Sequence, residues 1–167
     1  MRFYFLVREL RNLVCLKIFV KRFQKQDAIV IYVPDHGEEC YEENRGFICR
    51  NHSAEIDWPL AHYEFEIPFW IYCSPKYIRN HRDIYRQIRK AKDKRFMTDA
   101  LPHLLLYLAG IETPTYKEEY NILSPKYDEM RPRILKNSAD YDKLRDAHLE
   151  KIKKEESKKV IKKERRN

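Results

Sequence analysis

The sequence predicts an α/β fold, from two apolar runs and the helical patterns around them. Residues 28–33 read Ala-Ile-Val-Ile-Tyr-Val, a continuous run typical of a strand buried on both faces of a parallel sheet. Residues 65–73 form a second apolar run, which we expect to be another strand. A helix, a short connection, a buried strand and a polar loop, in this order, are typical of an α/β sheet.

Composition indicates a folded chain of about one domain. Of the 167 residues, 43% are hydrophobic, which is enough for a core and excludes disorder throughout the chain. Only three glycines are present, so neither the Rossmann nor the P-loop phosphate-binding pattern can be written. No apolar run reaches the roughly 18 residues of a transmembrane helix.

Spacing predicts the remaining elements. Apolar residues at helical intervals predict an amphipathic helix over 10–25 and a surface helix over 77–93. Residues 111–138 have little periodicity, so we expect a long packed loop, followed by a charged helix from Tyr141 to the end. Pro68 has no amide hydrogen to donate, which favours an edge position or a bulge for the second strand.

One helix has clear signals at both ends. Thr98 is a candidate N-cap ahead of the apolar stretch 101–108. Pro102 fits the first helical turn, where its missing N–H is no loss. Gly110 fits the position just after the helix.

The positive charge is concentrated in the C-terminal tail. The net charge is +8, and residues 149–167 carry nine Lys and Arg against four Glu. Such a tail is either a solvated terminal helix or a contact surface for nucleic acid or anionic lipid. The rest of the chain has no recognition-helix or aromatic-platform pattern, so nucleic acid is not the favoured partner.

The cysteines and the N-terminus bear on the compartment. The four cysteines lack C-x-x-C spacing, which excludes a zinc ribbon and a thioredoxin motif. Cys40 and Cys49 are close enough in sequence to form a disulfide under oxidising conditions, and buried thiols are the alternative. Charged residues interrupt the apolar segment 1–20, unlike a signal peptide, so the chain as it stands is expected to stay in the cytoplasm.

The segment after the first strand is the strongest candidate for chemistry. Asp35, His36, Gly37 and Glu38 follow the strand directly, and the carboxyl end of a parallel strand is where α/β proteins bind ligands. A carboxylate and an imidazole are good ligands for Zn²⁺ or Mn²⁺. We expect Gly37 to permit a sharp turn and Glu38 to orient the imidazole. A polar loop without metal is the alternative.

Two more histidines precede the second strand. His52 and His62 are candidate metal ligands or phosphate-contacting groups, and for each one an exposed loop histidine is the alternative. His81 and His103 lie in expected helices and carry no special pattern.

Several separated motifs together resemble one family. They are the runs 23–39 (FQKQDAIVIYVPDHGEE) and 66–72 (EIPFWIY), then 96–99 (FMTD) with 104–109, and 131–133 (RPR). In this order they resemble the C-terminal part of the membrane-anchored phosphoethanolamine transferases of the alkaline-phosphatase and sulfatase superfamily. The Glu-Ile-Pro-Phe segment favours the transferases over the wider sulfatases.

The resemblance implies a fold, an activity and a location. The fold would be the incomplete C-terminal portion of an alkaline-phosphatase-like sandwich, with a largely parallel central sheet between helices. The family moves phosphoethanolamine from phosphatidylethanolamine onto lipid A or another surface glycan, in a periplasmic domain anchored to the inner membrane. By this resemblance, residues 1–19 are an atypical segment, residues 20–145 the catalytic part and residues 146–167 a basic tail.

The family's zinc is held by a Glu, the nucleophilic Thr and an Asp-His pair, and Asp35 and His36 match that pair. His52 best matches a downstream histidine that helps to bind metal or substrate phosphate, with His62 as the reserve. The family's nucleophile lies upstream of the Asp-His-Gly motif, whereas the first threonine in this sequence is Thr98.

The expectation is therefore a transferase fragment that is inactive alone, because the nucleophile is missing. The alternatives are a fragment of another metal-dependent phosphate or sulfate hydrolase of the superfamily, and a non-catalytic module that complements a partner chain.

Overall fold

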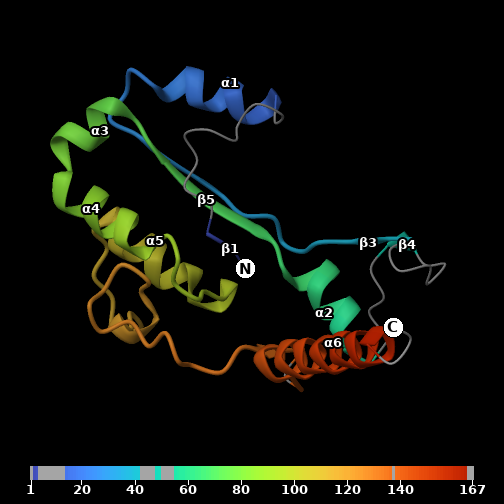
Figure 1. Cartoon of the computed structure of the whole chain (residues 1–167). Helices are drawn as coiled ribbons and strands as arrows, with labels where there is room; N and C mark the ends of the chain where they lie inside the picture. The colour runs from blue at the N-terminus through green and yellow to red at the C-terminus, as the bar shows by residue number, and fades with distance from the viewer. Residues whose placement is uncertain (1, 4–13, 42–47, 50–54, 137, 165–167) are drawn as a thin grey trace. The chain divides into compact units, whose positions relative to one another are not determined.

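The computed structural model describes residues 2–3, 14–41, 48–49, 55–136 and 138–164. The described residues form two compact units, one from the ranges 1–35 and 67–131, the other from 36–66 and 132–167. Helices and small sheets occur in both (Figure 1). Within the described residues, no helix is both long and apolar enough to cross a membrane.

The first unit is built on a three-stranded sheet of order β1-β5-β2. Strand β5 (Pro68–Cys73) pairs antiparallel with β2 (Ile29–Tyr32) and parallel with β1 (Arg2–Phe3). The first strand was expected in a parallel sheet, but its pairing with β5 is antiparallel, so a largely parallel central sheet is not shown by the described residues. Pro68 was expected to require an edge position or a bulge; it is instead the first residue of the middle strand of the described sheet, where its missing donor is tolerated.

Helices cover one face of this sheet. The residues Phe69, Ile71 and Cys73 of β5 pack with Ile88 of α4 and Leu104 of α5 in one buried cluster. Helix α4 (Arg82–Ala91) places Ile84, Ile88 and Ala91 on its inner side, which is the spacing of one helical face. On the sheet, Trp70 stacks on Tyr32 with 4.7 Å between ring centroids.

The segment after β5 differs from the single helix expected over 77–93. It forms α3 (Pro75–Asn80) and α4, separated at His81. The His81 ring stacks on Tyr77 and its Nε2 lies 3.4 Å from Asp27 Oδ1. These contacts hold His81 at a non-helical φ of −126° and end the first helix.

Helix α5 (Leu101–Ala109) confirms two of its expected end signals. Pro102 lies in its first turn, and Gly110 follows its last residue with a left-handed φ of 65°. Thr98 does not cap α5, because it begins the separate 3-10 turn η3 (Thr98–Ala100). The chain then runs mainly as turns, with the short η4 (Glu118–Tyr120) and the buried residues Ile122 and Leu123.

The second unit holds α2 (Trp58–Phe65), the long helix α6 (Tyr141–Glu164) and two short hairpins. Strand β3 (Glu39–Cys40) pairs with β4 (Ile48–Cys49), and β6 (Ile134–Leu135) pairs with β7 (Ala139–Asp140). Ala61, Leu135 and Tyr141 form a small buried core between α2 and the start of α6. Helix α1 (Val14–Phe23) belongs to the first unit and lies within the range 10–25 expected to be helical.

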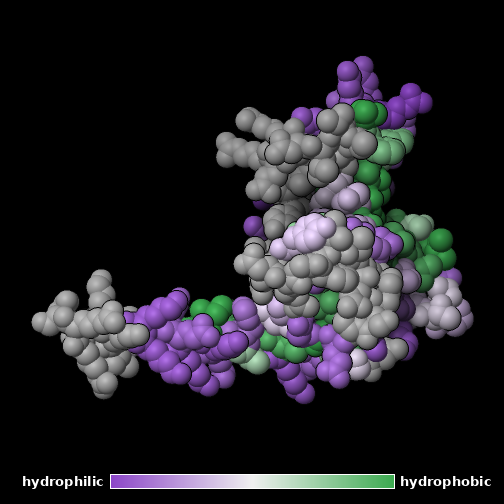
Figure 2. Space-filling model, turned by 90° about the vertical axis from the view of Figure 1, so that its right-hand side faces the viewer, coloured by the Kyte–Doolittle hydropathy of each residue, from purple (hydrophilic) through white to green (hydrophobic). Residues whose placement is uncertain are grey.

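The basic tail is helical, as expected, and solvated over its described part. Residues 149–159 of α6 are all exposed, and hydrophilic side chains dominate the surface of this part of the helix (Figure 2).

Candidate functional site

The Asp-His-Gly segment begins three residues after the last residue of β2, in an irregular stretch with a bend at Asp35. Asp35 is exposed and His36 is half-buried. The Nδ1 atom of His36 lies 2.8 Å from the carbonyl oxygen of Gly37. When Nδ1 donates its proton to that carbonyl, Nε2 carries the lone pair. Metal-binding histidines are usually oriented by such a bond at the other ring nitrogen.

Gly37 is fixed against helix α2 by its backbone. Its N–H donates to the carbonyl of Glu64 at 2.8 Å, and a Cβ at this position would lie 2.2 Å from the carbonyl oxygen of Tyr63. Among the described glycines only Gly110 has a positive φ. Close approach, and not unusual dihedral angles, is therefore what requires glycine at position 37.

The acidic residues after this segment lie in two environments. Glu38 is exposed, whereas the neighbouring Glu39 is fully buried at the start of β3. The oxygen found at His36 Nδ1 is the Gly37 carbonyl, so a role for Glu38 in orienting the imidazole stays a prediction.

His62 belongs to helix α2, and it is linked to α6 through Glu66 and Trp58, which contact both His62 and residues of α6. Its Nδ1 lies 3.0 Å from Glu66 Oε1, and the Tyr141 hydroxyl donates to the same oxygen. The ring of Trp58 stacks on His62 on one side and on His148 of α6 on another, with centroid distances of 5.6 and 5.3 Å.

These contacts set the electrostatics of the α2–α6 contact. Burial raises the pKa of Glu66, and the hydrogen bonds from Tyr141 and His62 outweigh that effect, so the pKa lies below its ordinary value. The hydroxyl of Tyr141 has a raised pKa because of its burial and because it donates to a carboxylate.

The two remaining expectations concern His52 and the complete ligand set. His52 lies outside the described residues. Over the parts of the chain that are described, no three His, Cys, Asp or Glu side chains gather as a metal site would require. Asp35 and His36 are thus adjacent candidate ligands, with no third one assigned.

The structure also joins residues that sequence reasoning left without partners. Arg131 donates to both carboxylate oxygens of Asp99, at 2.5 and 2.8 Å, and its guanidinium lies 4.3 Å from the centroid of the Tyr120 ring. The bond from Arg131 lowers the pKa of Asp99. In the second unit, Arg133 makes a similar two-bonded pair with Asp142. In the sequence, the only signal for the pair of Arg131 and Asp99 was that the two residues lie in the motifs 131–133 and 96–99.

No protein-family model matches the chain, and no curated protein sequence matches it. Two crystal structures of the C-terminal periplasmic domain of EcEptC from Escherichia coli do match, one of them a complex with Zn. The TM-scores are 0.62 and 0.60, at 25% identity, and each match covers 77% of this chain and 36% of the solved chain.

The present chain thus spans little more than a third of that domain's length. The predicted resemblance is confirmed: the chain is similar to the C-terminal periplasmic domain of EptC, a phosphoethanolamine transferase.

Proposed function

We propose that the chain is the C-terminal part of the catalytic domain of a zinc-dependent phosphoethanolamine transferase. The observation that carries this proposal is the structural match to the EptC periplasmic domain over 77% of the chain. In the complete domain, the outer strands β1 and β2 would pair with further strands of a larger sheet, because unpaired strand edges are usually covered.

Asp35 and His36 would be two of the zinc ligands. A carboxylate and an imidazole suit Zn²⁺, and the His36 Nδ1 contact with the Gly37 carbonyl gives the ring the orientation that a ligand needs. One of the matched EptC structures is a complex with Zn, which favours zinc over manganese. For a further ligand, the first candidate would be His52, which lies outside the described residues, and the reserve would be His62 of helix α2.

The chemistry supplied by a bound zinc ion is neutralisation of phosphoryl oxygens and activation of a hydroxyl nucleophile. Within this sequence no threonine precedes Thr98, and Thr98 begins a 3-10 turn in another motif. The nucleophile would therefore lie on a segment of the parent protein that precedes these 167 residues.

The donor and acceptor follow from the family alone. Phosphatidylethanolamine would be the donor and lipid A or a related surface glycan the acceptor, with the reaction in the periplasm. The complete parent protein would be held at the inner membrane by an anchor.

Zinc titration of the ¹⁵N-labelled chain tests the ligand assignment. We expect Zn²⁺ to shift the amide signals of residues 35–37 with a weak affinity, because a partial ligand set binds weakly. His36→Ala should remove the shifts. His81→Ala is the matched control, since it deletes an imidazole paired with Asp27 in the first unit, and it should leave them in place. Equal zinc shifts at residues 35–37 in wild type and His36→Ala would overturn the assignment.

A transfer assay tests where the nucleophile lies. With zinc, labelled phosphatidylethanolamine and lipid A, the 167-residue chain should give no transfer above the protein-free background. Transfer by this chain alone would show that a residue within it, and not an upstream threonine, is the nucleophile.

A further inference from the structure

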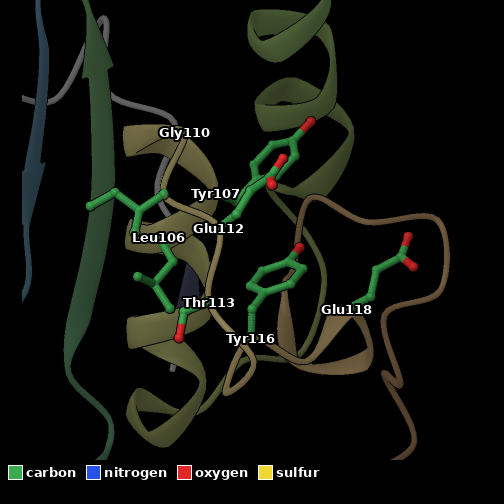
Figure 3. Close-up of a pocket in the computed structure, with 8 residues that line it drawn as sticks. Leu106, Tyr107, Gly110, Glu112, Thr113, Tyr116 and Glu118 are labelled. Atoms are coloured by element: carbon green, nitrogen blue, oxygen red, sulfur yellow. The ribbon is translucent and has the colours of Figure 1, made fainter.

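A cavity of about 480 Å³ opens in the first unit where helix α5 ends. Its lining comes from the last turn of α5, from residues 110–113, from Tyr116 and from Glu118 at the start of η4 (Figure 3). This volume lies within the range of small-molecule sites. Most of the lining is apolar, and Leu106 and Ile111 provide aliphatic surface.

Two aromatic rings in the lining are held in place by buried or half-buried partners. The hydroxyl of Tyr107 donates to Gln87 Oε1 at 2.9 Å. The hydroxyl of Tyr116 accepts from Nδ2 of Asn121, also at 2.9 Å, and Asn121 is fully buried. Both hydroxyls are thus anchored, so the rings are oriented before any ligand arrives and little further ordering is needed.

The charges around the cavity favour a cation. Glu112 contributes a carboxylate to the lining. Glu118 also lines the cavity, but Lys126 lies 2.8 Å from its Oε2 and offsets its charge. Helix α5 ends at the cavity with no basic side chain in its last turn, and the C-terminal end of a helix carries a partial negative charge.

The cavity lining combines aromatic rings, the Glu112 carboxylate, a helix C-terminus and aliphatic side chains. Together these features favour one class of ligand. Aromatic faces attract ammonium groups, whereas a strongly hydrated metal ion would find too few oxygen ligands in this mainly apolar lining. We propose that this cavity binds an organic ammonium ion with a short aliphatic chain. The ammonium group lies by Glu112 and the tyrosine rings, and the chain lies along Leu106 and Ile111.

The probes are n-hexylammonium and its uncharged counterpart n-hexanol, titrated into the full ¹⁵N-labelled chain. We expect the ammonium ion to shift the amide signals of residues 106–118 and to bind at least about threefold more tightly than the alcohol. Equal affinity for both would overturn the proposal, because the cavity would then recognise only the alkyl chain. A third titration, with dihexanoyl phosphatidylethanolamine, tests whether the ammonium group that binds belongs to a lipid headgroup or to a free amine. Tighter binding than n-hexylammonium indicates a lipid headgroup, and weaker binding indicates a free amine.

Matched variants locate the binding groups. Glu112→Gln should lower the affinity for n-hexylammonium at least about threefold and leave the affinity for n-hexanol unchanged. Glu119→Gln, which removes the same charge from an exposed residue outside the lining, should change neither. Tyr116→Leu should lower the affinity for the ammonium ion more than Tyr116→Phe does, because Tyr116→Phe keeps the aromatic ring. Unchanged ammonium affinity in folded Glu112→Gln would overturn the proposal, and this exposed substitution does not depend on the tolerance of position 116.

Discussion

The backbone of Gly37 lies too close to helix α2 for any side chain to fit. A Cβ would be 2.2 Å from the Tyr63 carbonyl oxygen, and that oxygen belongs to a helix and cannot move aside cheaply. We expect Gly37→Ala to lower the free energy of unfolding by about 1–3 kcal/mol and to displace the segment that carries His36. Urea denaturation measures the first effect and the His36 amide shift the second.

Gly110 is the informative control for this substitution. Its φ is 65°, yet a Cβ there would meet no atom within 4 Å. Gly110→Asn should therefore be tolerated, because Asn adopts the left-handed region more readily than other residues, whereas Gly37→Asn should not. Similar costs at both positions would contradict the distinction between close approach and dihedral preference.

Tyr141 influences stability through the protonation of Glu66. The pKa of Glu66 lies below its ordinary value in the folded chain. Its stabilising effect is therefore complete above the unfolded pKa of about 4.3 and is lost as the pH falls through the folded pKa. Tyr141→Phe removes one hydrogen bond, so the Glu66 pKa should rise and stability should fall by about 1 kcal/mol near pH 7 and less near pH 2. Carboxyl NMR titration and urea midpoints at both pH values check this, and an unchanged Glu66 pKa would contradict it.

At the scale of elements, the N-caps of helices α2 and α3 can be compared, because one is exposed and the other is buried. The exposed Asp57 side chain accepts from Leu60 N at the start of α2. Ser74 starts α3, is fully buried, accepts from Tyr77 N and donates to the carbonyl of Gln26. Asp57→Ala should cost about 1 kcal/mol, and Ser74→Ala about 2 kcal/mol or more, because it leaves buried groups unpaired. Denaturation midpoints measure both, and the reverse order would contradict the role of the Ser74 hydroxyl.

Elements with local signals were predictable, and elements fixed by distant contacts were not. Helix α5 was found because Pro102 and Gly110 mark its ends, and α6 because its charged pattern is long. Helix α2 was missed, although Asp57 and Pro59 are start signals, because its eight residues lie in a polar region. The direction of β2 relative to β5 depends on a connection of more than thirty residues, which apolar periodicity does not describe.

The candidate site shows the same division. The segment 35–37 was singled out from its place after a strand and from the family resemblance, but the sharp turn expected at Gly37 is not assigned there. His62 contacts Glu66, four residues further along the chain, and Glu66 accepts a hydrogen bond from Tyr141, another 75 residues away. The longer of these contacts forms only when α6 packs on α2. No local pattern in one sequence contains that information.

At the scale of the whole molecule, the second half of α6 adds charge more than stability. Residues 149–159 are exposed, and the packing against α2 comes from the first turns of α6, through Tyr141 and Leu144. Deleting residues 150–167 should change the free energy of unfolding by less than about 0.5 kcal/mol. Thermal and urea denaturation of the shortened chain measure this, and a loss of several kcal/mol would show that the tail packs on the folded units.

The chain's two tryptophans are distributed one to each unit. Trp70 is buried against Tyr32 in the first unit, and Trp58 lies between His62 and His148 in the second. The ring of Trp58 contacts side chains of both α2 and α6, so its emission should change when α6 separates from α2, while the emission of Trp70 reports on the sheet of the first unit. The molecule therefore carries its own pair of optical reporters. Replacing either indole with Phe lets the unfolding of each unit be followed by itself.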